Sequence, residues 1–298
     1  MKKLLLVLIL CTFFPTNIVY SQTNEQINKH IQYNTYLSKG RYAMKNENYS
    51  QAIAYFDSAS LVFPHFHKPY FEVVVCTSRL NDYEKAYLYA VKMILTGSPF
   101  CITPETLGEF CNTDYYKQLK VQEDSLYQYS MQKRDTAFAN AVIQLFHKNQ
   151  LIGLRKDTTT FYEFVALCVQ KNAFPSYLNV GTDAYRYAFA LLYNSFWHSN
   201  YPDSDDWKNL LSLIHRDFLL GGIEASLIAQ LEDTYYRNNN LPLRYGTFSN
   251  IYNPNNDIYP SIEELNKNRI EAGLEPFELE AILWNIDLNI LTDEQRKQ

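Results

Sequence analysis

Two stretches of the chain, "GRYAMKNENYSQAIAYFDSASLVFP" (residues 40–64) and "NDYEKAYLYAVKMILTGSP" (residues 81–99), share one pattern of small and large apolar residues. Within each stretch these residues recur three or four positions apart, which gathers them on one face of an α-helix. The pattern repeats after 34 residues, so that Tyr49, Ala52, Phe56 and Ala59 correspond to Tyr83, Ala86, Ala90 and Met93. A period of this length is typical of stacked helical hairpins.

With Gly40 and Pro64 at their expected places, residues 33–99 resemble tetratricopeptide repeats. The second copy is degenerate, because Val74 replaces the first-helix glycine and Pro99 comes one position late. Two such units cannot bury their faces alone, so we expect residues beyond 100 to cover them. A helix is expected to begin at "TPETLGEF", with Thr103 as its N-cap.

The remainder of the chain also has helical periodicity, and no alternating strand pattern of convincing length is present. Ser261 and Glu264 form a capping box, and Gly273 is expected to end that helix. We therefore predict an all-α fold in which a short tetratricopeptide-like array packs on a C-terminal helical domain. The expected segments are a signal peptide (1–21), repeats (22–100), connecting helices (101–140) and a helical domain (141–298).

The N-terminal residues "MKKLLLVLILCTFFPTNIVYSQ" have the features of a secretory signal peptide. Two lysines precede an apolar run that is about half the length needed to span a bilayer. Val19 and Ser21 suit signal-peptidase cleavage before Gln22. We expect an exported protein, periplasmic or secreted, with no integral membrane segment after cleavage.

Composition narrows the classes of partner. The chain has a net charge of −5 and no basic run, which makes it a poor candidate for nucleic-acid binding. Four cysteines remain after cleavage, and export permits disulfides among them, but free buried thiols are an equal alternative: Cys76, Cys101, Cys111 and Cys168. No CxxC pair or HExxH helix is present, so we expect no metal and no cofactor.

The C-terminal half contains several short elements in a distinctive order. They are Phe174-Pro175, Val180-Gly181, His198, Asp233, Tyr245-Gly246-Thr247, and Arg269 with Gly273-Leu274. Over residues 140–280 this order resembles a bacterial domain family of unknown function. Its members carry Gln-His-Ala-Asp, Tyr-Gly-Thr-Gln and Arg-Arg-x-x-x-Gly-Leu elements. The resemblance implies a helical fold, but it implies no particular reaction.

The chain departs from that family at several polar positions. Trp197 precedes the histidine where the family has Gln, Thr234 replaces an Arg, Phe248 replaces a Gln, and Asn268 replaces the first Arg of the last element. Two interpretations remain open. The chain belongs to a divergent branch with a changed ligand, or the site has decayed and a scaffold remains.

The long loop before residue 260 suggests where a site would lie, because such loops in compact domains usually have a function. We hypothesise that it folds over two helix ends and forms a polar pocket of His198, Asp233, Tyr245, Thr247 and Arg269. A histidine beside a carboxylate can transfer protons near neutral pH. The alternative is structural: Arg269 pairs with Asp233, and Tyr245 anchors the loop.

Two functions are consistent with the sequence. The favoured one is an exported helical scaffold or interaction protein that binds a protein or peptide partner. The other is an exported enzyme, for example a hydrolase, that uses the corner around His198, Asp233 and Tyr245. Because no catalytic signature accompanies these residues, we favour binding.

Overall fold

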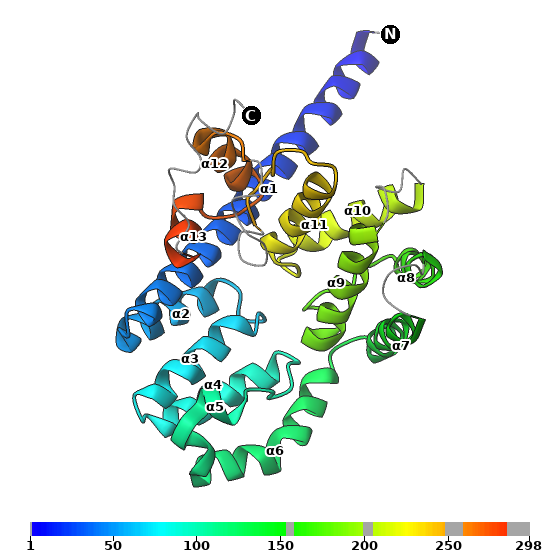
Figure 1. Ribbon diagram of the computed structural model, residues 1–298. Coiled ribbons are helices and arrows are strands. Elements are labelled where there is room, and N and C mark those ends of the chain that lie inside the picture. Colours follow the sequence, from blue (N-terminus) through cyan, green and yellow to red (C-terminus); the bar gives the residue numbers. More distant parts are fainter. Residues whose placement is uncertain (1, 153–157, 199–204, 248–258, 285–298) are drawn as a thin grey trace.

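The computed structural model describes residues 2–152, 158–198, 205–247 and 259–284, and it confirms the all-α prediction (Figure 1). Across this described part, every regular element is helical. Of residues 2–23, 151–152, 158, 194–198, 206–207 and 284 only the helical backbone is described. The helices of the first half are α1 (Lys2–Lys45), α2 (Tyr49–Val62), α3 (Lys68–Arg79), α4 (Tyr83–Leu95), α5 (Pro104–Leu107), the 3₁₀-helix η1 (Gly108–Asn112) and α6 (Asp114–Met131).

In the second half, two short helices follow a series of longer ones. They are α7 (Thr136–Ile152), α8 (Thr158–Lys171), α9 (Gly181–His198), α10 (Asp205–Leu219), α11 (Ala225–Asn238), α12 (Ile262–Glu271) and α13 (Phe277–Trp284). Among the described residues, no helix combines the length and the apolar character that crossing a membrane requires.

The first four helices pack in chain order, each against the next. The two copies of the 34-residue pattern begin alike. Asn48 caps α2 by accepting the N–H of Gln51, and Asp82 caps α4 by accepting the N–H of Lys85. The caps follow a turn in which Glu47 and Asn81 both have φ of +58°. Three of the four equivalent positions are buried in both copies, as Ala52, Phe56 and Ala59 in α2 and as Ala86, Ala90 and Met93 in α4.

Gly40 explains how α1 and α2 come so close. A Cβ at this position would lie 2.5 Å from Cε1 of the buried Phe56 ring, so only glycine fits. At the other end of the array, α6 packs on α4. The helix expected at Thr103 does begin there, with Pro104 in its first turn, but it lasts one turn before the 3₁₀-helix η1.

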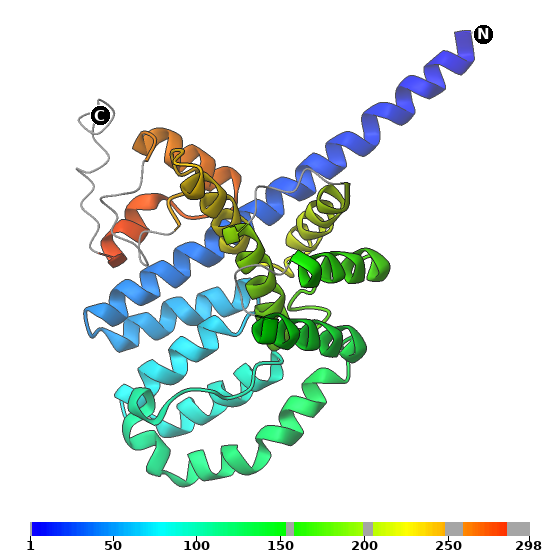
Figure 2. The ribbon, with the colours of Figure 1, turned by 45° about the vertical axis from the view of Figure 1, so that its right-hand side comes forward.

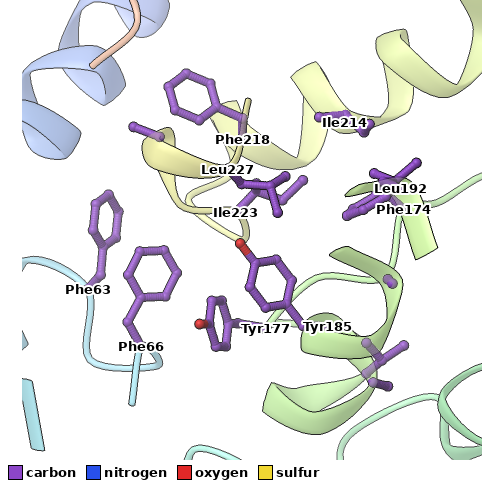
Figure 3. Packing of buried hydrophobic residues seen from close by; sticks show 14 of the residues in the cluster. Phe63, Phe66, Phe174, Tyr177, Tyr185, Leu192, Ile214, Phe218, Ile223 and Leu227 are labelled. Carbon is purple, nitrogen blue, oxygen red and sulfur yellow. The ribbon is translucent and has the colours of Figure 1, made fainter. Parts of the chain in front are cut away.

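One hydrophobic core joins α1, α2 and α3 to the rear helices and extends from Tyr33 on α1 to Leu274 after α12. A second core lies among α3, α4 and α6. In Figure 3, Tyr177 lies beside Phe66 of the α2–α3 connection and next to Tyr185 of α9, below Ile223 and Leu227 near the start of α11. The chain curves round in Figures 1 and 2, and α10, α12 and α13 return to contact α1. This closure brings α1 and α3 opposite α9 and α11.

Candidate functional site

Asp233, on α11, is the centre of the corner that the sequence singled out. Its side chain is fully buried and accepts four hydrogen bonds. The backbone N–H groups of Arg244 and Tyr245 donate to Oδ1 at 2.8 and 2.9 Å. Thr247 donates to Oδ2 through both its backbone N–H and its hydroxyl, each at 2.8 Å. One carboxylate therefore fixes the Tyr245-Gly246-Thr247 turn.

Arg269, on α12, holds the same turn from the opposite side and is also almost fully buried. Its Nη1 donates to the carbonyl of Tyr245 at 2.7 Å, and its Nε donates to the carbonyl of Glu275 at 2.7 Å. Its Nη2 forms an ion pair with Glu280 at 2.6 Å. The pairing that the structural alternative expected, Arg269 with Asp233, is thus replaced by Arg269 with Glu280.

The other predicted members of this corner have different positions. The Tyr245 hydroxyl donates to Glu232 at 3.0 Å, so the tyrosine does anchor its loop by hydrogen bonds. His198 is the last residue of α9, and its side chain lies outside the described residues. Thus Asp233, Tyr245, Thr247 and Arg269 gather in one place.

The chemistry of Asp233 is that of an internal anchor. Burial raises its pKa, the four donors from the turn act in the opposite direction, and the net shift is upward. Donors that surround a carboxylate favour its ionised form and occupy the lone pairs that a base would use. The arrangement suits holding a turn better than moving a proton.

A larger cavity, which we call the central cleft, lies between the front and rear helices, with a volume of about 490 Å³. Its charged lining residues come from α1 (Arg41), α3 (Lys68 and Glu72), α9 (Arg186) and the N-cap of α11 (Glu224). Its aromatic lining is formed by Phe71, Tyr177, Tyr185 and Phe189. A smaller cavity of about 160 Å³ shares Arg41, Lys68 and Glu224 with it and extends to Thr247 and Arg269.

Glu224 organises the wall of the central cleft. Its buried carboxylate pairs with Lys68 and accepts the Tyr177 hydroxyl at 2.8 Å. Its backbone N–H donates to the Tyr185 hydroxyl at 3.3 Å. Burial by itself would raise the pKa of Glu224, but Lys68 and Tyr177 outweigh it and the net shift is downward. Glu224 is therefore a fixed negative charge.

His67 extends this network, because its Nδ1 lies 3.4 Å from the Tyr177 hydroxyl. Burial lowers the pKa of His67 to about 4, so its ring is neutral at pH 7. A second ion pair, Arg41 with Glu72 at 2.9 Å, lies on the same side of the cleft. The charged residues of the front wall are thus all paired, and its histidine is neutral.

Sequence reasoning did not find the central cleft. Lys68 and Glu224 are 156 positions apart, and each has an ordinary local explanation, one in the first turn of a helix and the other at an N-cap. The one available signal was "PHFHKP", a polar, aromatic turn between two buried helices. This motif indicates a turn of unusual composition, but it does not show which distant residues face that turn.

In the described part of the chain, no group of three or more His, Cys, Asp or Glu side chains is arranged to hold a metal ion. The four described cysteines are free thiols: Cys76 and Cys168 are buried, Cys111 is partly buried, and Cys101 is exposed.

No protein-family model, no curated protein and no solved structure matches the chain. The function must therefore be argued from the geometry of its own residues.

Proposed function

We propose that the protein is an exported helical interaction protein whose central cleft binds a peptide segment of a partner. The observation that carries this proposal is the cleft itself. Its volume of about 490 Å³ falls within the 300–1,000 Å³ range of typical ligand pockets. Its lining combines aromatic surface with a few placed charges, which is the composition that recognition sites favour.

The repeat pattern supports the same proposal. Tetratricopeptide-like arrays, which the front of the chain resembles, hold peptides on a concave surface formed by successive hairpins. Here α1, α3 and α4 contribute Arg41, Phe71 and Met93 to one side of the cleft, and α9 and α11 contribute the other. A peptide that entered the cleft would contact both halves of the molecule at once.

The corner around Asp233 supports binding over catalysis. Both carboxylate oxygens accept hydrogen bonds from the 244–247 turn, and the Tyr245 hydroxyl donates to Glu232. These groups are committed to the fold. The small cavity that reaches Thr247 and Arg269 joins the cleft wall, so the corner stabilises one end of the proposed binding site.

Export is part of the proposal and rests on the signal-like N-terminal sequence. N-terminal sequencing of the protein recovered from the envelope or the medium is expected to give Gln22 as the first residue. Recovery of the intact N-terminus from the cytoplasm alone would contradict export and leave the cleft proposal unaffected.

Binding is tested by filling the cleft. Gln230 lies on α11 at the cleft wall, whereas Gln128 on α6 is exposed and is not part of the lining. The probe is a set of N-acetylated tripeptides of Ala, Leu, Phe and Glu, with free or amidated C-termini, in equilibrium dialysis with mass-spectrometric detection. Wild type and Gln128→Trp are expected to retain the same subset, and Gln230→Trp to lose it. Equal retention by Gln230→Trp, or no retention by wild type, would contradict the proposal.

A further inference from the structure

Arg186 differs from the other cations of the central cleft. Arg41 is paired with Glu72, and Lys68 is paired with Glu224. Arg186, an exposed residue on the α9 side of the cleft, forms no hydrogen bond or ion pair in the described part of the chain. Asp183, one turn earlier, interacts with it only through the electrostatic field.

The charge of the lining follows from these pairings. Three cationic side chains and two carboxylates line the cleft, and His67 is neutral at pH 7 because burial lowers its pKa to about 4. The cleft therefore carries one net positive charge, although the chain as a whole has a net charge of −5. That excess charge is located at Arg186.

We propose that Arg186 binds a single carboxylate of the peptide that occupies the central cleft. A guanidinium group can donate two parallel hydrogen bonds to a carboxylate. Phe189, one turn further along α9, and Tyr185 provide aromatic surface beside it. The ligand class is thus an apolar peptide with one negative charge, at its C-terminus or on an acidic side chain.

A dianion fits this cleft less well than a carboxylate. Glu72 and Glu224 are buried and ionic, and Arg41 and Lys68 only balance them. A phosphate group with two negative charges would leave the cleft with a net negative charge. A guanidinium group can bind either anion, and the net charge of the cleft therefore favours a carboxylate over a phosphate.

The inference rests on the proposed function, and its test compares matched peptides. Each tripeptide is measured as the free acid, as the C-terminal amide, as an amide containing Glu, and as an amide containing phosphoserine. We expect a free acid or a Glu amide to bind at least about tenfold more tightly than the neutral amide, the size of one charged hydrogen bond. Arg186→Gln should abolish this difference, and Arg186→Lys should restore part of it.

The outcomes separate the two proposals. Equal binding of charged and neutral peptides, still lost in Gln230→Trp, would overturn the role of Arg186 and leave the peptide cleft standing. Tightest binding of the phosphoserine amide would overturn the choice of carboxylate. Unchanged acid preference in Arg186→Gln would overturn the role of Arg186. Failure of every peptide to bind wild type would contradict both proposals.

Discussion

Asp233 and Arg269 hold opposite sides of one turn without bonding to each other. Asp233 accepts the backbone N–H groups of residues 244, 245 and 247, and Arg269 donates to the carbonyl of residue 245. An anion thus satisfies the donors of the turn and a cation satisfies its acceptor. Because both side chains are buried, the turn is fixed by charge-assisted hydrogen bonds in a low-dielectric environment.

Replacing Asp233 by Asn is expected to destabilise the fold by about 2–4 kcal/mol. The amide nitrogen of Asn is a donor, and it would face N–H or O–H groups that now point at a carboxylate oxygen. Urea unfolding measures the loss. Asp124→Asn on the exposed face of α6 is the control and should change stability little. Unchanged stability of Asp233→Asn would show that the carboxylate does not hold the turn.

Replacing Arg269 by Met is expected to cost about 3–5 kcal/mol, because the partly buried Glu280 would lose its partner. Burial raises the pKa of Glu280, and Arg269 opposes that shift. Without Arg269 the carboxyl will protonate more readily, so the destabilisation should be smaller at pH 5 than at pH 7. The double variant Arg269→Met, Glu280→Gln should recover part of the loss. A pH-independent loss with no recovery would refute this pairing.

The burial of His30 predicts that the protein loses stability at acidic pH. It is fully buried, its Nε2 lies 3.2 Å from the Phe218 carbonyl, and its Nδ1 has no hydrogen-bond partner among the residues that the structure describes. Burial lowers its pKa from 6.5 to about 4. Between these values the unfolded chain binds a proton that the folded chain does not, so this contribution to stability is complete above pH 6.5 and is lost toward pH 4.

The magnitude of the His30 effect is about 3 kcal/mol across that interval. His30→Gln keeps a donor for the Phe218 carbonyl but removes the titration. Unfolding free energies measured from pH 7 to pH 4 should therefore fall less steeply for the variant than for wild type. Parallel curves for the two proteins would show that His30 does not titrate as described.

The helices were predictable because their signals are local. Ser261 caps α12 by accepting the N–H of Glu264, as the capping box indicated, and Gly273 follows that helix with a φ of +79°. The 34-residue period likewise reflects contacts between neighbouring helices. Such features depend on residues that are close in sequence, where spacing and propensity are informative.

The site was only partly predictable. The order of short elements placed Asp233, Tyr245, Thr247 and Arg269 in one corner, but it could not show that Glu280 would pair with Arg269. The cleft wall could not be predicted from the sequence, because Lys68 pairs with Glu224 only after the chain has closed on itself. No local pattern encodes a contact between residues so distant in the sequence.

A substitution at Gly40 tests the close approach of α1 and α2. Gly40→Ala is expected to destabilise the protein by about 1–3 kcal/mol, because the new methyl group would overlap the Phe56 ring. Phe56→Leu reduces that ring, so the double variant should be more stable than the sum of the single losses implies. Denaturant unfolding of the four proteins completes the cycle. Additive losses would show that the two residues do not constrain each other.

The most direct test of the central claim is the position of a bound peptide. A photoreactive benzoyl-phenylalanine is placed at Phe189 inside the cleft or at Tyr162, an exposed residue of α8 outside it. After irradiation with a tripeptide retained by wild type, mass spectrometry identifies the cross-linked protein. If the peptide occupies the central cleft, we expect a cross-link from position 189 and none from position 162. Cross-linking from position 162 alone, or equally from both, would contradict this placement.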